Sequence, residues 1–202
     1  DYSCLWSARM TDFTIARSEL ILGGQKSGKS RRAELLARQW VQQSPEHRAV
    51  MIATAQPWDD EMRLRIARHQ QERAERVPGM TTVEEPLALA EAIARHSTPA
   101  TLVVVDCLTL WLTNQLMPVD FEPNSPPAQV EPAQIASFLI AIAQAPGPVV
   151  LVGNEIGLGV IPMGREVRAF VDALGRLNQQ VAAICERVTL MAAGLPLTLK
   201  AP

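Results

Sequence analysis

The chain has 202 residues, of which 48% are hydrophobic and 20% charged, and a formal net charge of −2 at pH 7. This length and composition fit one globular domain with a full core and exclude a disordered chain. The near-neutral charge gives no reason to expect nucleic acid or an anionic membrane as a partner, and no apolar run approaches the roughly 18 residues of a membrane-spanning helix.

The N-terminal residues 1–18 predict an irregular extension, because they lack the basic and apolar segments of a secretory signal. Residues 19–202 predict a single catalytic domain. The three cysteines (Cys4, Cys107 and Cys185) are widely spaced and form no C-x-x-C pair. Few, unpaired cysteines are typical of a reducing compartment, so we expect a cytoplasmic protein.

The first predicted strand, residues 19–22, runs directly into a glycine-rich loop that ends in Gly-Lys-Ser. A strand, the pattern G-x-x-x-x-G-K-S and a following helix together predict a P-loop, in which backbone N–H groups surround phosphate. Lys29 is then expected to reach the β- and γ-phosphates, and Ser30 to ligate Mg²⁺. The alternative is a turn that binds nothing. The nucleotide-binding residues predicted here are Gly23, Gly24, Gln25, Lys26, Ser27, Gly28, Lys29 and Ser30.

Strands and helices alternate along the remainder of the chain, apart from a loop at 118–132 that contains five prolines. The alternation predicts an α/β fold, a three-layer P-loop (RecA-like) sandwich around a mostly parallel sheet. The predicted strands are 49–53, 81–84, 101–105, 149–152, 188–193 and, after a turn at 194–196, 197–200. The predicted helices are 31–42, 59–76, 87–95, 107–117, 135–143 and 165–186.

Polar residues follow three of the predicted strands, namely Thr54, Asp106 and Asn154. The carboxyl ends of parallel strands meet at one edge of a sheet, so these residues and the P-loop predict one site. Asp106 ends the most apolar strand and is expected to help hold Mg²⁺, as in the Walker B arrangement. The alternative role for Asp106 is to cap the next helix.

The predicted helix 59–76 carries charged side chains and a histidine at spacings of three and four residues, which places most of them on one face. One interpretation is a solvated helix with surface ion pairs. The other is a cationic surface for a polyphosphate that contains a nucleophilic imidazole. The chain lacks the Asn-Lys-x-Asp motif of small GTPases and is poor in aromatic residues, which favours a small-molecule transferase over a switch or a translocase. The face comprises Arg65, Arg68, His69, Glu72, Arg73 and Arg76.

Six segments carry a resemblance to a known family. They are residues 22–31, 52–56 with 59–62, 65–69, 105–114, 154–162 and 175–179, the most specific being Asp-Cys-Leu-Thr at 106–109 and Asn-Glu-x-Gly-x-Gly-x-x-Pro at 154–162. The sequence resembles the bifunctional adenosylcobinamide kinase / adenosylcobinamide-phosphate guanylyltransferase family of cobalamin biosynthesis. It departs from the family in two places. This chain has Gln25-Lys26 where the family commonly has Ala-Arg, and its residues 76–82 lack the His-Trp-Arg that the family usually has there.

The resemblance implies two reactions on adenosylcobinamide. A kinase step uses ATP or GTP, and a second step transfers GMP from GTP to adenosylcobinamide phosphate through a guanylylated histidine. It implies His69 as that nucleophile and Lys29 as the second catalytic residue. It also implies a homo-oligomer, with a trimer as one form. The further nucleotide-binding residues that it implies are Ala53, Thr54, Ala55, Glu84 and Asp106, with Ser30 and Asp106 as the Mg²⁺ ligands.

Two other functions fit the residues. The first is a one-step P-loop kinase for another small alcohol, without a covalent nucleotidyl intermediate, in which His69 is structural. The second is a nucleotide-gated binding protein that has no turnover. The preference for ATP or GTP in the kinase step stays open.

Overall fold

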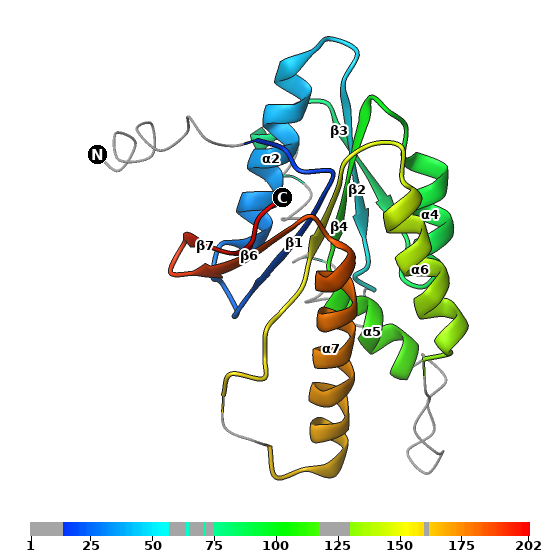
Figure 1. The fold of residues 1–202 in the computed structure, drawn as a ribbon, viewed down its shortest axis with the longest axis vertical. Coiled ribbons are helices and arrows are strands. Elements are labelled where there is room, and N and C mark those ends of the chain that lie inside the picture. The colour runs from blue at the N-terminus through cyan, green and yellow to red at the C-terminus, as the bar shows by residue number, and fades with distance from the viewer. Residues whose placement is uncertain (1–13, 57–63, 65–70, 72–74, 118–129, 160–161) are drawn as a thin grey trace.

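The computed structural model describes residues 14–56, 64, 71, 75–117, 130–159 and 162–202. Within them one seven-stranded sheet has the strand order β3-β2-β4-β5-β1-β6-β7 (Figure 1). The strands are β1 (Ser18–Gly23), β2 (Arg48–Ala53), β3 (Met80–Glu84), β4 (Thr101–Asp106), β5 (Val149–Val152), β6 (Arg187–Ala192) and β7 (Leu195–Lys200). The helices are α2 (Lys29–Gln43), α4 (Leu89–His96), α5 (Leu108–Leu116), α6 (Pro132–Gln144) and α7 (Arg165–Ile184).

Neighbouring strands are parallel except for the β6–β7 pair, which confirms the predicted mostly parallel sheet. The predicted turn at 194–196 is wrong, because Leu195 and Pro196 belong to β7. The turn is Ala193-Gly194, where both residues have positive φ values of 52° and 78°. Two successive positive φ values match the twist of a two-residue hairpin, so β7 starts two residues earlier than expected.

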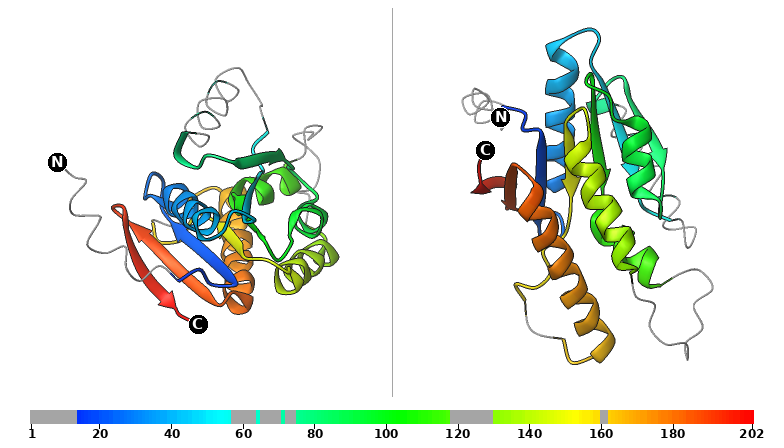
Figure 2. Two further views of the ribbon diagram at one scale, coloured as in Figure 1. Left: turned by 90° about the horizontal axis from the view of Figure 1, so that it is seen from above. Right: turned by 45° about the vertical axis from the view of Figure 1, so that its right-hand side comes forward.

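Two apolar layers lie on opposite faces of the sheet, because successive residues of a strand point to opposite sides. Helix α2 packs on one face against Ile21, Met51 and Val104. The other face, which includes Leu20 and Val105, is covered by α4, α5, α6 and α7 (Figure 2). The expected three-layer sandwich is therefore confirmed.

Most predicted helix boundaries differ from the observed ones by one to three residues. Helix α6 begins earlier than expected because Pro132 occupies its first turn, where a missing N–H costs nothing. The predicted helix 59–76 and the proline-rich loop fall largely outside the described residues. The boundary at residue 18 between an extension and a domain stays a prediction.

A buried carboxylate ties β1 to α2. The side chain of Glu19 is 1% exposed, and its Oε1 accepts a 2.7 Å bond from Nε of Arg32 and a 2.8 Å bond from the hydroxyl of Thr189. The Nη1 of Arg187 lies 3.5 Å from the other oxygen. Arg32 belongs to the first turn of α2, so this cluster fixes the start of that helix against the sheet.

We expect Glu19→Ala to lower the free energy of unfolding by about 3–5 kcal/mol, because it leaves the Arg32 guanidinium buried without its carboxylate. Equilibrium urea unfolding measures the change. The matched control is Glu46→Ala in an exposed turn, which should change stability by less than about 0.5 kcal/mol. Equal effects of the two substitutions would contradict a stabilising role for the buried cluster.

Candidate functional site

The loop between β1 and α2 has the backbone that the P-loop pattern predicts. Gly28 precedes α2 with φ 102°, a conformation that L side chains rarely adopt, and a Cβ there would lie 3.3 Å from Cα of Gly194. At Gly23, a Cβ would lie 2.5 Å from both the carbonyl oxygen of Met191 and the hydroxyl of Ser27. The backbone conformation at Gly28 and the close packing at Gly23 therefore favour glycine at both positions.

The start of α2 has no side-chain cap. The first N–H groups of a helix lack intrahelical acceptors and carry the positive end of the helix dipole, so an uncapped start suits a phosphate group. Ser27 adds to this, because its hydroxyl is buried without a hydrogen-bond partner. The loop thus offers several donors to one anion.

Lys29 folds back over this loop, and its Nζ donates a 2.6 Å bond to the carbonyl of Gly24. Burial lowers the pKa of Lys29, while the nearby carboxylate of Asp106 acts in the opposite direction. The ammonium therefore lies within electrostatic reach of the end of β4. A buried cation with few partners is poised to pair with incoming phosphate.

Three strand ends meet at the carboxyl edge of the sheet, as predicted. Ala53 pairs with Asp106 across β2 and β4, and Asp106 pairs with Val152 across β4 and β5. Thr54, Asp106 and Asn154 consequently lie at the carboxyl ends of β2, β4 and β5, which are adjacent in the sheet. Strand β5 lies between β4 and the P-loop strand β1. The capping role for Asp106 is wrong, because Cys107 is the N-cap residue of α5 and no side chain caps that helix.

The residues around Thr54 differ in exposure. Ala53 is buried, Ala55 is partly buried, and Glu84 is exposed at the end of β3, beside Ala53 in register. Thr54 is 0% exposed, and its hydroxyl is hydrogen-bonded to the backbone of Cys107. Binding of nucleotide at these positions stays a prediction.

The loop after β5 is held by side chains from two helices. The N–H of Asn154 donates to the hydroxyl of Thr109 in α5 (2.9 Å), and its carbonyl accepts from Nδ2 of Asn178 in α7 (3.1 Å). The N–H of Glu155 donates to the carbonyl of Gly23 (3.1 Å). The β5 loop and the P-loop are therefore joined directly. The Oδ1 of Asn178 is buried and unpartnered.

Thr109, Asn114 and Asn178 were not predicted from the sequence as residues of the site. Asn114 and Asn178 are 3% and 4% exposed and lie on apolar helix faces. A polar side chain on the buried face of an amphipathic helix needs a hydrogen-bond partner, and this pattern was the available signal.

Cys107 is the alternative nucleophile in this part of the site, because it adjoins Asp106 and Lys29. Burial, with a contribution from Asp106, raises the pKa of its thiol to about 11. A thiol with such a pKa is almost entirely protonated at neutral pH and is a poor nucleophile. Burial therefore disfavours Cys107 as a nucleophile on phosphorus.

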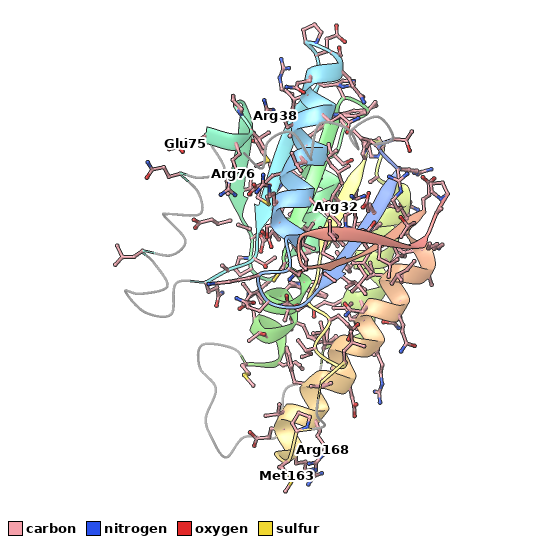
Figure 3. All side chains as sticks on the ribbon, turned by 90° about the vertical axis from the view of Figure 1, so that its left-hand side faces the viewer. Arg32, Arg38, Glu75, Arg76, Met163 and Arg168 are labelled. Carbon is pink, nitrogen blue, oxygen red and sulfur yellow. The ribbon has the colours of Figure 1, made fainter. Side chains whose placement is uncertain are left out.

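His69 and its neighbours Arg65, Arg68 and Arg73 lie outside the described residues. Of the predicted cationic face, Arg76 is described. Its Nη1 donates a 3.0 Å bond to the carboxylate of Glu34, a buried residue of α2. Figure 3 labels Arg76 beside α2. This ion pair joins the segment that precedes β3 to the P-loop helix.

The described residues fit Mg²⁺ carried by a nucleotide. Mg²⁺ prefers oxygen ligands and is usually held by one or two protein groups together with phosphates and waters. Ser30 and Asp106 supply a hydroxyl and a carboxylate on adjoining parts of the site. No cluster of three or more potential metal-ligating His, Cys, Asp or Glu side chains occurs among the described residues, so these residues offer no all-protein cage.

The glycine-shaped loop, the uncapped start of α2, the buried lysine and the strand-end carboxylate define a P-loop nucleotide-binding protein. Residues 19–199 match the family described as "Cobinamide kinase / cobinamide phosphate guanyltransferase". The chain belongs to this family.

Two curated relatives agree with that assignment. The chain is 46% identical over 183 residues to the bifunctional adenosylcobalamin biosynthesis protein CobP of Pseudomonas aeruginosa, covering 90% of this chain and 96% of the relative. It is 37% identical over 189 residues to the corresponding CobU protein of Escherichia coli K12, covering 90% and 98%.

Among solved structures, the flagellar accessory protein FlaH from Methanocaldococcus jannaschii has a TM-score of 0.53 at 11% identity, covering 97% of this chain and 84% of that chain. This likeness concerns the fold alone.

We expect Lys29→Met to make the nucleotide-free protein at least as stable as the wild type. Burial lowers the pKa of Lys29, so its charged form is penalised on folding at neutral pH. As pH rises through the lowered pKa, the wild type loses its charge and this penalty, so any advantage of Lys29→Met should shrink. Urea unfolding between pH 7 and 10 measures the trend.

The same substitution should remove stabilisation by GTP, which amounts to about 2.7 kcal/mol for the wild type at a hundredfold excess over Kd. Lys200→Met is the control, because Lys200 ends β7 and its Nζ bonds to the carbonyls of Ala182 and Ala183 in α7. Retention of the full GTP effect in Lys29→Met would contradict the assignment of Lys29 to phosphate.

Proposed function

We propose that this chain carries out both reactions named by its family, with adenosylcobinamide as the substrate and His69 as the covalent nucleophile. The observation that carries the proposal is the family match over residues 19–199. The P-loop geometry supports it, because one loop can hold a triphosphate for attack at either of two phosphorus atoms.

In the kinase step, the aminopropanol hydroxyl of adenosylcobinamide attacks the γ-phosphorus of ATP or GTP. The bond between this phosphorus and the β–γ bridging oxygen breaks, and the nucleoside diphosphate leaves. The transferring phosphoryl group gathers negative charge that fixed cations stabilise. Lys29 and the N–H groups at the start of α2 supply that stabilisation in this chain.

In the second step, an imidazole nitrogen of His69 attacks the α-phosphorus of GTP and pyrophosphate leaves. A phosphate oxygen of adenosylcobinamide phosphate then attacks the same phosphorus, which releases His69 and gives adenosylcobinamide-GDP. A neutral imidazole is available near pH 7. The protonated thiol of Cys107 supports the choice of a histidine over this cysteine as the nucleophile.

Mg²⁺ is part of the proposal, held by Ser30 and Asp106. When bound, it would neutralise charge on the triphosphate. Asp106 also acts on its own, because its carboxylate lies close enough to Lys29 to favour the charged ammonium. Lys29 can therefore remain protonated in a buried position.

The corrinoid is proposed to approach the loop after β5, beside Asn154 and Glu155. Large apolar side chains are exposed along this loop and the start of α7, with Leu158 79% and Met163 95% exposed. Figure 3 shows Met163 and Arg168 at the end of α7 that lies furthest from the sheet. An exposed apolar patch is typical of a surface that binds a large ligand or a second protein.

We also propose a homo-oligomer, such as a trimer, in the cytoplasm. The exposed leucines of edge strand β7, at 56–60% exposure, support association between copies. Cys107 and Cys185 are free and buried, which supports a reducing compartment. Across the described residues, no helix has the length and apolarity to span a membrane.

GTP labelled at the α-phosphorus tests the covalent step. Incubation without corrinoid should transfer label to the wild-type protein, in an acid-labile and base-stable form that is typical of a phosphoramidate. His69→Ala should lose the label and keep the kinase activity, because γ-phosphoryl transfer does not use the imidazole.

His96→Ala is the matched control, since His96 ends α4 and should retain the label. Cys107→Ser should retain it as well. Turnover of adenosylcobinamide phosphate by a wild-type enzyme that never becomes labelled would overturn the covalent mechanism. Transfer of the γ-phosphate alone would favour the one-step kinase.

A further inference from the structure

The hydroxyl of Thr54 is used completely inside the protein. It donates a 2.7 Å bond to the carbonyl of Cys107 and accepts a 2.8 Å bond from the N–H of the same residue. A hydroxyl has one hydrogen to donate, and the side chain is 0% exposed. It therefore cannot also donate to a ligand, and its role has to be exerted through Cys107.

The backbone of Thr54 is fixed on both sides. Its N–H donates to the carbonyl of Asp106 (3.1 Å), which extends the β2–β4 pairing by one residue. Its carbonyl accepts a 2.8 Å bond from Nδ2 of Asn114, a residue of α5 that is 3% exposed. The same amide donates to the carbonyl of Pro86 (3.1 Å). Thr54 and Asn114 thus link the ends of β2 and β4 to the segment after β3, and we call this set of contacts the strand-end clamp.

The clamp replaces a local cap at the start of α5. Cys107 is the N-cap residue and no side chain caps the helix. The chain between Asp106 and α5 is therefore held in part by hydrogen bonds from Thr54 at the end of the neighbouring strand β2. Asp106 lies directly before the clamped residue, and its own side chain is only partly buried.

We propose that Thr54 is a positioning residue that holds the carboxylate of Asp106 in the orientation in which it acts with Lys29 on a metal-bound triphosphate. The inference rests on the proposed nucleotide site, and it adds Thr54 as the residue that positions Asp106 in that site. Thr54 itself need not touch the phosphates through its side chain. Release of the clamp should weaken the contribution of the metal and leave the P-loop contacts intact.

Isothermal titration calorimetry with guanosine 5′-(α,β-methylene)triphosphate tests the proposal, because this analogue cannot be cleaved at the α–β bond. Its affinity is measured with Mg²⁺ and with EDTA, and the ratio of the two is the metal increment. Thr54→Val keeps the shape and removes the hydroxyl. It should reduce the metal increment by about tenfold, the loss expected when buried polar groups lose their partner, while the affinity in EDTA changes by less than about twofold.

Thr54→Ser should keep most of the metal increment, since it restores the hydroxyl. Thr98→Val is the control, because it removes a part-buried hydroxyl contact (2.8 Å to the buried Thr101) at the opposite edge of the sheet. It should leave both affinities unchanged. A purely structural role for Thr54 would lower stability in urea without changing the increment, and that result would overturn the proposal.

If Thr54→Val does not fold, Asn114→Leu decides the question, since it releases the backbone of Thr54 and keeps the hydroxyl. A smaller metal increment supports the clamp, and a wild-type increment overturns it. A wild-type protein that binds the analogue with no metal increment would overturn the proposed Mg²⁺ site, and the clamp with it. Failure of the wild type to bind the analogue at all would contradict the P-loop assignment.

Discussion

The first N–H groups of α2 have no acceptors within the helix and no side-chain cap, and the site is organised around this deficit. A phosphate group can satisfy these donors, and the helix dipole favours its charge. The deficit is useful only if the helix start is held in place. Glu19 provides this by binding Arg32 in the first turn of α2 and Thr189 in β6, so the P-loop is fixed by its own strand, its own helix and the next strand.

The parallel sheet then brings the remaining groups to the same edge. The charge of Asp106 acts on Lys29, although β5 lies between β4, which ends in Asp106, and the P-loop strand β1. Side chains from α5 and α7 hold the intervening loops, through Thr109, Asn114 and Asn178. Asn114 and Asn178 are buried, and hydrogen bonds between buried polar groups favour a single arrangement. These contacts hold in place the loops beside the charged groups Lys29 and Asp106.

The sequence was sufficient for the fold class, the P-loop and the strand-end polar residues, because each has a short-range signal. Glycine spacing identifies the loop, and apolar runs that end in Thr54, Asp106 and Asn154 identify the sheet edge. The roles of Thr54 and Asn114 could not be predicted, since their bonds join residues more than fifty positions apart. The early start of β7 was missed because a positive φ at Ala193 is unusual for a residue with a Cβ.

The central claim is that one P-loop serves both phosphorus centres, and the most direct measurement compares the two half-reactions in Lys29→Met. Phosphorylation of adenosylcobinamide by γ-labelled GTP and labelling of the protein by α-labelled GTP are followed in parallel under identical conditions. A single site predicts that both rates fall by a factor of at least about 100, as when one preorganised charge is removed from a transition state. A kinase step that is lost while guanylylation keeps its wild-type rate would contradict the account, because the two reactions would then use different nucleotide sites.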